Sequence, residues 1–207
     1  MSAFLGPVYG HATYVMRHGQ TVLDDEKRSD GWLDYPLSDK GRIGLMDAQQ
    51  FLKLAPIRTV YAPTLRRAEE TGHIIASGIL NHPKEVVADA AKTWNLGTLI
   101  GSKKKPNKPL VHYFMDHPNE TPMGGESMQA FCARWIPWLL KTVHKDNGAS
   151  LIVTSGSNLR AIGTALYGDT DKFDLDEGGL MVLLPEGNSA NGQVIFGHKD
   201  GDEEDFS

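Results

Sequence analysis

The chain has 207 residues, of which 40% are hydrophobic, and carries a formal net charge of -5 at pH 7. This length and composition predict one globular domain with a sizeable core, and the acidic balance argues against a broad basic face for nucleic acid or a membrane surface. Cys132 is the single cysteine, which excludes an internal disulfide framework and suits a reducing compartment.

Short runs rich in Val, Ile and Tyr alternate with segments of helical periodicity. The strand-like runs cover residues 13–16, 58–62, 85–88, 150–154, 180–184 and 193–196. The helical segments cover residues 39–54, 65–80, 126–145 and 158–168, and the third of them contains Pro137, where we expect a kink. This alternation predicts an α/β fold in three layers, with a mostly parallel central sheet flanked by helices.

Residues 98–122 interrupt this alternation with several prolines and a group of four lysines. The lysines are Lys103, Lys104, Lys105 and Lys108. We expect an insertion that forms a lid, whose lysines attract an anionic substrate; an ordinary solvated loop is the alternative. The acidic residues 199–207 are expected to form a frayed tail.

Polar residues follow two of the predicted strands directly. Residues 17–19 read Arg-His-Gly, and residues 155–158 read Ser-Gly-Ser-Asn. The carboxyl ends of parallel strands meet at one edge of a sheet, which is where ligands bind in such folds. A third strand leads to Arg66 and Arg67 at the start of a helix, where backbone N–H groups favour an anion. Together these features predict an anion pocket.

Phosphoryl transfer is the chemistry that fits these residue types. A neutral imidazole at His18 can accept a phosphoryl group and so divide one difficult displacement into two easier ones. An arginine such as Arg17 can bind two phosphoryl oxygens at once, and its charge favours the unprotonated form of the histidine. Gly19 lets the backbone approach the phosphate because it has no side chain.

Five sequence blocks resemble, in order, those of the histidine phosphatase superfamily, which includes cofactor-dependent phosphoglycerate mutases and many broad phosphatases. The blocks are RHGQT at 17–21, GWLDYPLSDKGR at 31–42, VYAPTLRRAEET at 60–71, GGES at 124–127 and LIVTSGSNLRAI at 151–162. The resemblance implies a phosphoglycerate mutase-like fold, His18 as the phosphorylated nucleophile, and Arg17 and Arg67 as phosphate clamps. Arg67 is preferred to Arg66 because it begins the family's Arg-Ala-x-x-Thr pattern.

Three positions depart from the family pattern. The place of the family's second histidine, aligned on Arg160, holds Ser155, and the place of its acid holds Thr93. Asp24 stands where an asparagine is common, which puts a like charge near a phosphate. Replacing a charged hydrogen-bond donor by serine removes transition-state stabilisation worth roughly a hundredfold to a thousandfold in rate. The site therefore keeps its nucleophile and lacks two helpers.

The remaining predicted site residues are expected to contact the substrate. They are Gly19, Thr21, Asp24, Thr93, Glu126 and Gly156. Glu126 is also a candidate substitute proton donor, although its place before a helix suits the helix dipole equally well. His112, Asp116 and His117 lack the spacing of a metal site and are expected at the surface, so no metal or cofactor is predicted.

The sequence thus predicts a metal-independent phosphomonoester hydrolase that acts through phosphorylated His18 on a phosphorylated small molecule or other anionic phosphate ester. The alternative is a catalytically impaired or inactive phosphate-binding protein of the same fold; a phosphoglycerate mutase is the weaker third reading. We expect neither nucleic acid nor membrane as a partner, and the oligomeric state is open. No secretory leader or bilayer-spanning run is visible in the sequence, so the expected location is cytoplasmic.

Overall fold

The computed structural model describes residues 11–145 and 148–198. Its sheet has the strand order β3-β2-β4-β1-β5-β6. The strands are β1 (Thr13–Arg17), β2 (Ile57–Ala62), β3 (Lys84–Val87), β4 (Ala149–Thr154), β5 (Leu175–Glu186) and β6 (Ser189–His198). β3, β2, β4 and β1 are parallel, and β5 and β6 run antiparallel at one side of the sheet. The predicted mostly parallel sheet is confirmed.

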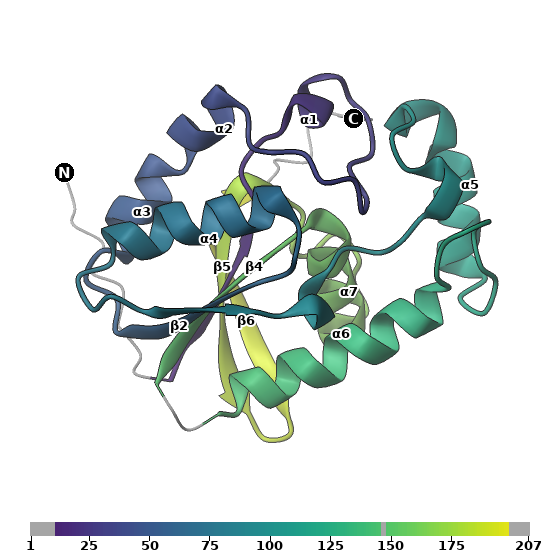
Figure 1. The fold of residues 1–207 in the computed structure, drawn as a ribbon. Coiled ribbons are helices and arrows are strands. Elements are labelled where there is room, and N and C mark those ends of the chain that lie inside the picture. Colours follow the sequence, from purple (N-terminus) through teal and green to yellow (C-terminus); the bar gives the residue numbers. More distant parts are fainter. Residues whose placement is uncertain (1–10, 146–147, 199–207) are drawn as a thin grey trace.

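Seven α-helices and two 3-10 turns surround the sheet within these residues (Figure 1). The helices are α1 (Val22–Asp25), α2 (Asp39–Gly44), α3 (Met46–Leu52), α4 (Arg66–Gly78), α5 (Lys104–Asp116), α6 (Met128–Val143) and α7 (Gly156–Tyr167); the turns are η1 (Asp89–Ala91) and η2 (Gly97–Leu99). The single helix predicted over 39–54 is two helices that meet at Leu45. Gly41 and Gly44 lower the helix propensity there, which explains the break.

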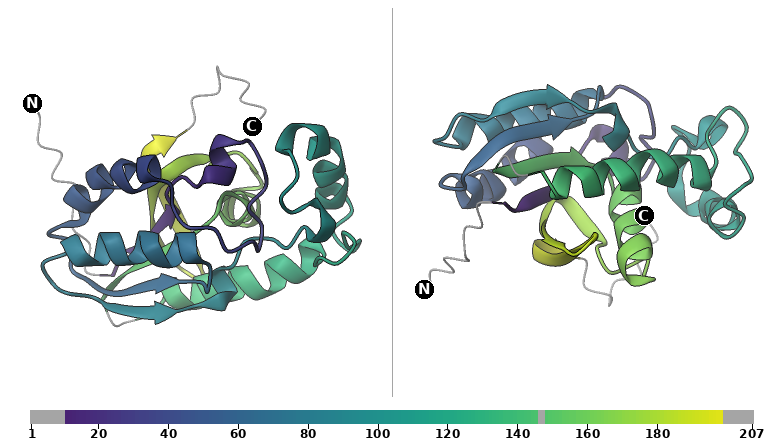
Figure 2. Two further views of the ribbon diagram at one scale, coloured as in Figure 1. Left: turned by 45° about the horizontal axis from the view of Figure 1, so that its top comes forward. Right: turned by 90° about the horizontal axis from the view of Figure 1, so that it is seen from below.

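Helices cover both faces of the sheet, as the two views of Figure 2 show. Along β1, Tyr14 and Met16 face the core formed with α3 and α4, whereas Val15 faces the core formed with α6 and α7. This alternation follows from the two-residue period of a strand. β1 is therefore buried on both faces, and only its carboxyl end is left for chemistry.

α6 packs into the core through one face. Phe131, Trp135 and Leu139 are each fully buried and lie four residues apart, which is the spacing of one helix face. The Ser127 hydroxyl caps the helix by accepting from the N–H of Ala130 at 3.1 Å. Pro137 lies inside this helix, which continues to Val143.

The proline-rich insertion contains a 13-residue helix, α5, so most of its lysine segment is helical rather than a loop, although Lys103, Lys105 and Lys108 are exposed as a solvated segment requires. Lys104 begins the helix, and Pro106 falls in its first turn, where the missing N–H has no helical partner to lose. Figures 1 and 2 place α5 beside the loop that carries α1. The predicted tail at 199–207 lies outside the described residues.

No helix of the described chain is both long and apolar enough to cross a membrane. Within residues 11–145 and 148–198, no group of three or more His, Cys, Asp or Glu side chains is arranged to hold a metal ion.

Candidate active site

The carboxyl ends of β1 and β4 bring the predicted nucleophile and Ser155 together. Arg17 pairs with Thr154 in the parallel register, and the backbone N–H of His18 donates to the Thr154 carbonyl at 2.9 Å. Ser155 then serves as the extended N-cap residue of α7, and its side chain makes no capping hydrogen bond. His18 therefore lies beside a helix N-terminus, where backbone N–H groups favour a bound anion.

The hydrogen bonds of His18 fix which ring nitrogen carries the proton. Nε of Arg67 lies 3.1 Å from Nε2 of His18, and because a guanidinium only donates, Nε2 must accept. The proton is then on Nδ1, which donates to the Gly19 carbonyl at 2.9 Å. Burial and the neighbouring Arg67 and Arg17 charges lower the pKa of His18 to about 3. The imidazole is thus neutral near pH 7 and presents its lone pair at Nε2.

Arg67 is held by two backbone carbonyls of the loop that follows α1. Its Nη1 donates to Leu33 at 2.9 Å and its Nη2 donates to Gly31 at 2.7 Å. Arg67 is 1% exposed, whereas the side chain of Arg66 is 60% exposed and pairs with Glu70. The structure therefore brings the second arginine of the pair to the histidine.

Arg17 is fastened from the other side by β5. Its Nη1 donates to the Leu175 carbonyl at 2.7 Å and its Nη2 pairs with Glu177. Its Nε is buried and has no hydrogen-bond partner within the part of the chain that the structure describes. A Cβ placed on Gly156 would stand 3.8 Å from the Arg17 guanidinium carbon, so the first residue of α7 lies directly against this arginine. Arg17 thus joins β1, β5 and α7 at the site.

Two carboxyls with buried side chains, those of Asp24 and Asp30, lie around the loop that follows His18. The Asp24 carboxylate accepts from the Thr21 N–H and from Nζ of Lys104, both at 3.1 Å. Burial alone would raise the pKa of Asp24, but the protonated form of His18 and the charges of Lys104 and Arg17 outweigh burial and hold it well below its usual range; near pH 7, where His18 is neutral, Lys104 and Arg17 supply the positive charge. Asp24 is therefore ionised and neutralised by α5.

Asp30 is the second carboxyl, and the sequence analysis did not select it. Thr21 Oγ1 donates to Asp30 Oδ1 at 2.8 Å. Burial and the nearby Asp24 charge raise the pKa of Asp30 to about 6. A signal was present, because Asp30 directly precedes the Gly-Trp of the second family-like block; an acid at such a position can be selected as a site candidate.

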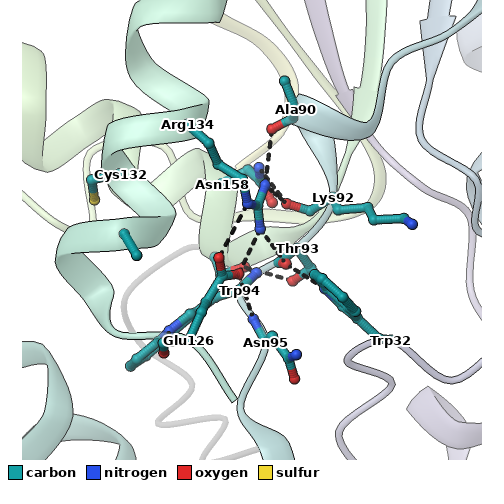
Figure 3. A network of polar contacts seen from close by, with 12 residues as sticks. Trp32, Ala90, Lys92, Thr93, Trp94, Asn95, Glu126, Cys132, Arg134 and Asn158 are labelled. Carbon is teal, nitrogen blue, oxygen red and sulfur yellow. Dashed lines mark hydrogen bonds and ion pairs between the residues drawn. The ribbon is translucent and has the colours of Figure 1, made fainter. Parts of the chain in front are cut away.

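Thr93 and Glu126 lie in a second polar network, drawn in Figure 3. Thr93 Oγ1 is 2.7 Å from Ser157 Oγ, which places Thr93 at the first turn of α7. Glu126 accepts from the Asn95 N–H at 3.0 Å and pairs with Arg134 at 2.6 Å. Glu126 thus joins the loop at Asn95 to α6.

Arg134 of α6 binds the backbone segment that carries Thr93 (Figure 3). It donates to the carbonyls of Ala90, Lys92 and Thr93 at 2.9 to 3.0 Å in addition to pairing with Glu126. This planar fork of donors suits several acceptors at once. The network fixes Thr93 against α7 without contacting His18.

The insertion packs on the loop that holds Arg67. Gly31 has φ +48°, and a Cβ at this position would fall 2.4 Å from the Ile100 side chain. The backbones of Ser29 and Gly101 are also hydrogen-bonded at 2.8 Å. Residues 97–103 and the carbonyl of Gly31 that binds Arg67 therefore belong to one packed unit.

The sequence pattern of the histidine phosphatase superfamily (branch 1) matches residues 13–193. A 2,3-bisphosphoglycerate-dependent phosphoglycerate mutase of Brucella anthropi is 31% identical over 167 residues, covering 75% of this chain and 81% of that protein. A mutase of the same description from Gloeobacter violaceus is 26% identical over 157 residues, 72% of each chain.

Solved structures of low sequence identity share the fold. The phosphoglycerate mutase of Bacillus anthracis superposes with a TM-score of 0.78 at 19% identity, covering 89% of this chain and 92% of that one. A mycobacterial glucosyl-3-phosphoglycerate phosphatase superposes with a TM-score of 0.74 at 20% identity, covering 89% and 97%. At these identities the likeness establishes the architecture, and both mutases and phosphatases are among the similar proteins.

Proposed function

The chain belongs to the histidine phosphatase superfamily (branch 1), and from this premise we propose that it hydrolyses phosphomonoesters through a phosphohistidine at His18. The observation that carries the proposal is the buried, neutral His18 ring whose Nε2 lone pair faces the Arg67 guanidinium at 3.1 Å. A phosphoryl group that replaces this contact would meet a nucleophile and a fixed positive charge at the same point.

The proposed reaction needs no metal ion, because protein cations and helix donors surround the phosphoryl group. Nε2 of His18 attacks phosphorus while Arg67 and Arg17 stabilise the charge on the equatorial oxygens. The backbone N–H groups at the start of α7, beginning at Gly156, supply further donors. Water then attacks the phosphohistidine and releases inorganic phosphate, which regenerates neutral His18.

Ser155 and Thr93 are the positions that set the expected rate. A serine hydroxyl at the N-cap of α7 offers a neutral hydrogen bond to the transferring group, which is weaker than one from a charged imidazole. Thr93 offers no acidic proton for a leaving group. We therefore expect slow turnover, fastest on esters whose leaving group needs no protonation.

Phosphoryl trapping at His18 tests the proposal. The protein is incubated with radiolabelled aryl phosphate, quenched in base, and assayed for acid-labile label and for phosphate release. We expect both from the natural chain and neither from His18→Ala. His73→Ala is the matched control, because the His73 side chain is 74% exposed and pairs only with Glu85 among its ion pairs; it should keep full labelling. Equal labelling in His18→Ala and the natural chain would contradict the proposal.

A phosphoglycerate mutase is the second candidate, favoured by the relatives at 26 to 31% identity that carry that name. It would interconvert phosphoglycerates only after priming with 2,3-bisphosphoglycerate, whereas the proposed hydrolase releases inorganic phosphate without a primer. A chain that binds phosphate at His18 but neither retains nor releases a phosphoryl group would be the impaired phosphate-binding protein instead. One assay with and without primer separates the three.

A further inference from the structure

Phosphomonoester hydrolysis at this site needs a proton for the departing oxygen, and Thr93, at the place of the family's acid, cannot supply one near neutral pH. Building on the proposed function, we propose that Asp30 is the general acid that protonates the leaving group. A carboxyl group suits this work when it lies at the pocket and its acid form persists near the working pH.

Three other carboxyls around the site each form an ion pair with a cation. Glu177 pairs with Arg17, and Glu126 pairs with Arg134 and also accepts from a backbone N–H. Asp24 pairs with Lys104 at 3.1 Å. Asp30 is the one carboxyl of these four for which no ion pair within 4.0 Å is recorded among the described residues.

Asp30 lies in the same loop whose carbonyls bind Arg67. Its neighbour Gly31 accepts from Nη2 of Arg67, and Nε of the same guanidinium contacts His18. Its own Oδ1 accepts from Thr21, the residue three positions after His18. Asp30 is 7% exposed, so bulk water does not compete for its proton. Asp30 is thus linked to the site through its neighbour Gly31, which binds Arg67, and through Thr21, which follows His18.

The charges facing Asp30 act in opposite directions. Burial and Asp24 disfavour its ionised form, while Arg67, the Thr21 hydroxyl and Lys104 favour it, and the balance raises its pKa to about 6. A phosphate dianion bound at Arg67 adds negative charge and offsets that cation, which raises the pKa further. Asp30 therefore holds its proton most firmly when the substrate is present.

The proton is conserved over the cycle. As the His18 Nε2–phosphorus bond forms and the ester phosphorus–oxygen bond breaks, the departing oxygen takes the Asp30 proton and leaves as an alcohol. Water then attacks the phosphohistidine, gives its proton to the Asp30 carboxylate and adds its oxygen to phosphorus. Phosphate departs, His18 is neutral again and Asp30 is protonated again.

Leaving-group dependence in Asp30→Asn is the decisive measurement. With phenyl phosphate, whose phenolate leaves poorly without a proton, kcat/KM should fall by about a hundredfold to ten-thousandfold. With 2,4-dinitrophenyl phosphate, whose leaving group needs no proton, kcat/KM and acid-labile labelling of His18 should change by less than about threefold. Asp25→Asn is the control: Asp25 is exposed on α1 and bonds to Gln20, and its loss should affect neither substrate.

The natural chain provides a second measurement that does not depend on the variant's folding. Below about pH 6 its rates should depend weakly on the acidity of the leaving phenol, and above that pH the dependence should become steep as Asp30 loses its proton. A steep dependence at every pH would overturn the assignment, as would an equal loss on both esters in Asp30→Asn, which is the signature of a structural role. If His18 is never labelled by the dinitrophenyl ester, the proposed function itself fails and the assignment with it.

Discussion

Under the proposed function, Ser155 is the residue at which a charged donor would serve the transferring phosphoryl group. It follows β4, adjoins His18 through the Thr154 hydrogen bond, and begins α7 without using its hydroxyl as a cap. Neither helix start nor strand pairing depends on that hydroxyl. The Ser155 hydroxyl is therefore not needed to begin α7.

Ser155→His should raise hydrolysis of a small aryl phosphate by about tenfold to a thousandfold, which corresponds to roughly 1.4 to 4 kcal/mol of transition-state stabilisation. The reason is the charged hydrogen bond that an imidazolium offers to the equatorial oxygens. Steady-state kcat/KM on 2,4-dinitrophenyl phosphate measures it, and His18→Ala in the same background is the control that must abolish turnover. A folded Ser155→His chain that still binds phosphate without gaining activity would identify the pocket as a receptor.

At the residue scale, some site residues could be predicted from the sequence and others could not, for physical reasons. The residues after β1 and β4 were selected because parallel strands end at one edge, and the structure does bring His18 and Ser155 together. Asp30 was missed because its importance comes from burial beside Asp24, and neither burial nor distance between side chains is written in local sequence pattern. The carbonyl partners of Arg67 were missed for the same reason.

At the scale of elements, α6 reaches the site through Arg134. One guanidinium satisfies three carbonyls and Glu126, and so holds the segment that carries Thr93 against α7. A helix that packs its other face into the core thereby fixes a loop at the pocket.

Arg134→Lys should lower the free energy of unfolding by about 1 to 3 kcal/mol, because an ammonium cannot replace the planar fork and leaves carbonyls unpaired. It should also lower kcat/KM, since the Thr93 segment loses its anchor. Urea denaturation and phosphatase assays measure the two effects. Lys141→Ala, on the exposed side of α6, should leave both unchanged; a similar change in the two variants would show that Arg134 holds nothing specific.

α5 brings charge to the site through Lys104, whose Nζ reaches the buried Asp24. Lys104→Met should raise KM for an aryl phosphate more than it lowers kcat, because the Asp24 carboxylate is then left to repel the substrate. Lys108→Met removes the same charge one turn along α5 and should act only weakly, with an effect that shrinks in high salt. Equal KM values for the two variants would contradict this role of Lys104.

Elements were predicted well where burial makes a strong period and less well elsewhere. Phe131, Trp135 and Leu139 repeat clearly along α6, so that helix could be placed from sequence. α5 has no buried residue and contains two prolines, so its composition resembles that of a loop. The break at Leu45 was missed because the hydrophobic pattern runs on through it from α2 to α3.

At the scale of the whole molecule, one hydrophobic core lies on each face of the sheet. The polar candidate site lies at the carboxyl ends of β1 and β4, between these cores. The strict alternation of apolar runs and helical segments was enough to predict this architecture, because few arrangements bury both. The order of the strands, and the antiparallel pair β5 and β6, depend on long-range pairing. That pairing leaves no local pattern, so it was not predicted.

The stability of the molecule should depend on pH through two buried groups of opposite effect. The pKa of Asp30 is raised to about 6, so its contribution is present below about pH 4, the unfolded value, and is lost as pH rises through 6. The pKa of His18 is lowered to about 3, so its contribution is present above about pH 6.5 and is lost as pH falls toward 3. Between pH 4 and 6 the two slopes oppose each other.

Asp30→Asn removes one slope and exposes the other. From pH 4 to 6 its unfolding free energy relative to that of the natural chain should rise by up to about 1.4 kcal/mol per pH unit. Guanidinium denaturation at intervals of pH measures this, with Asp25→Asn as the control that should run parallel to the natural chain. Parallel curves for Asp30→Asn as well would show that Asp30 titrates alike in the folded and unfolded chain.

Ile100 packs on the backbone of Gly31, and we expect this contact to couple substrate entry to phosphate binding. An outward movement of residues 97–103 would expose the loop whose Gly31 carbonyl accepts a hydrogen bond from Arg67. The same movement would weaken the binding of phosphate by Arg67, so the product phosphate would be released as the site opens. Trimming Ile100 to alanine should accordingly shorten the residence time of inorganic phosphate, seen as faster dissociation in stopped-flow measurements, while the nucleophilic step stays intact.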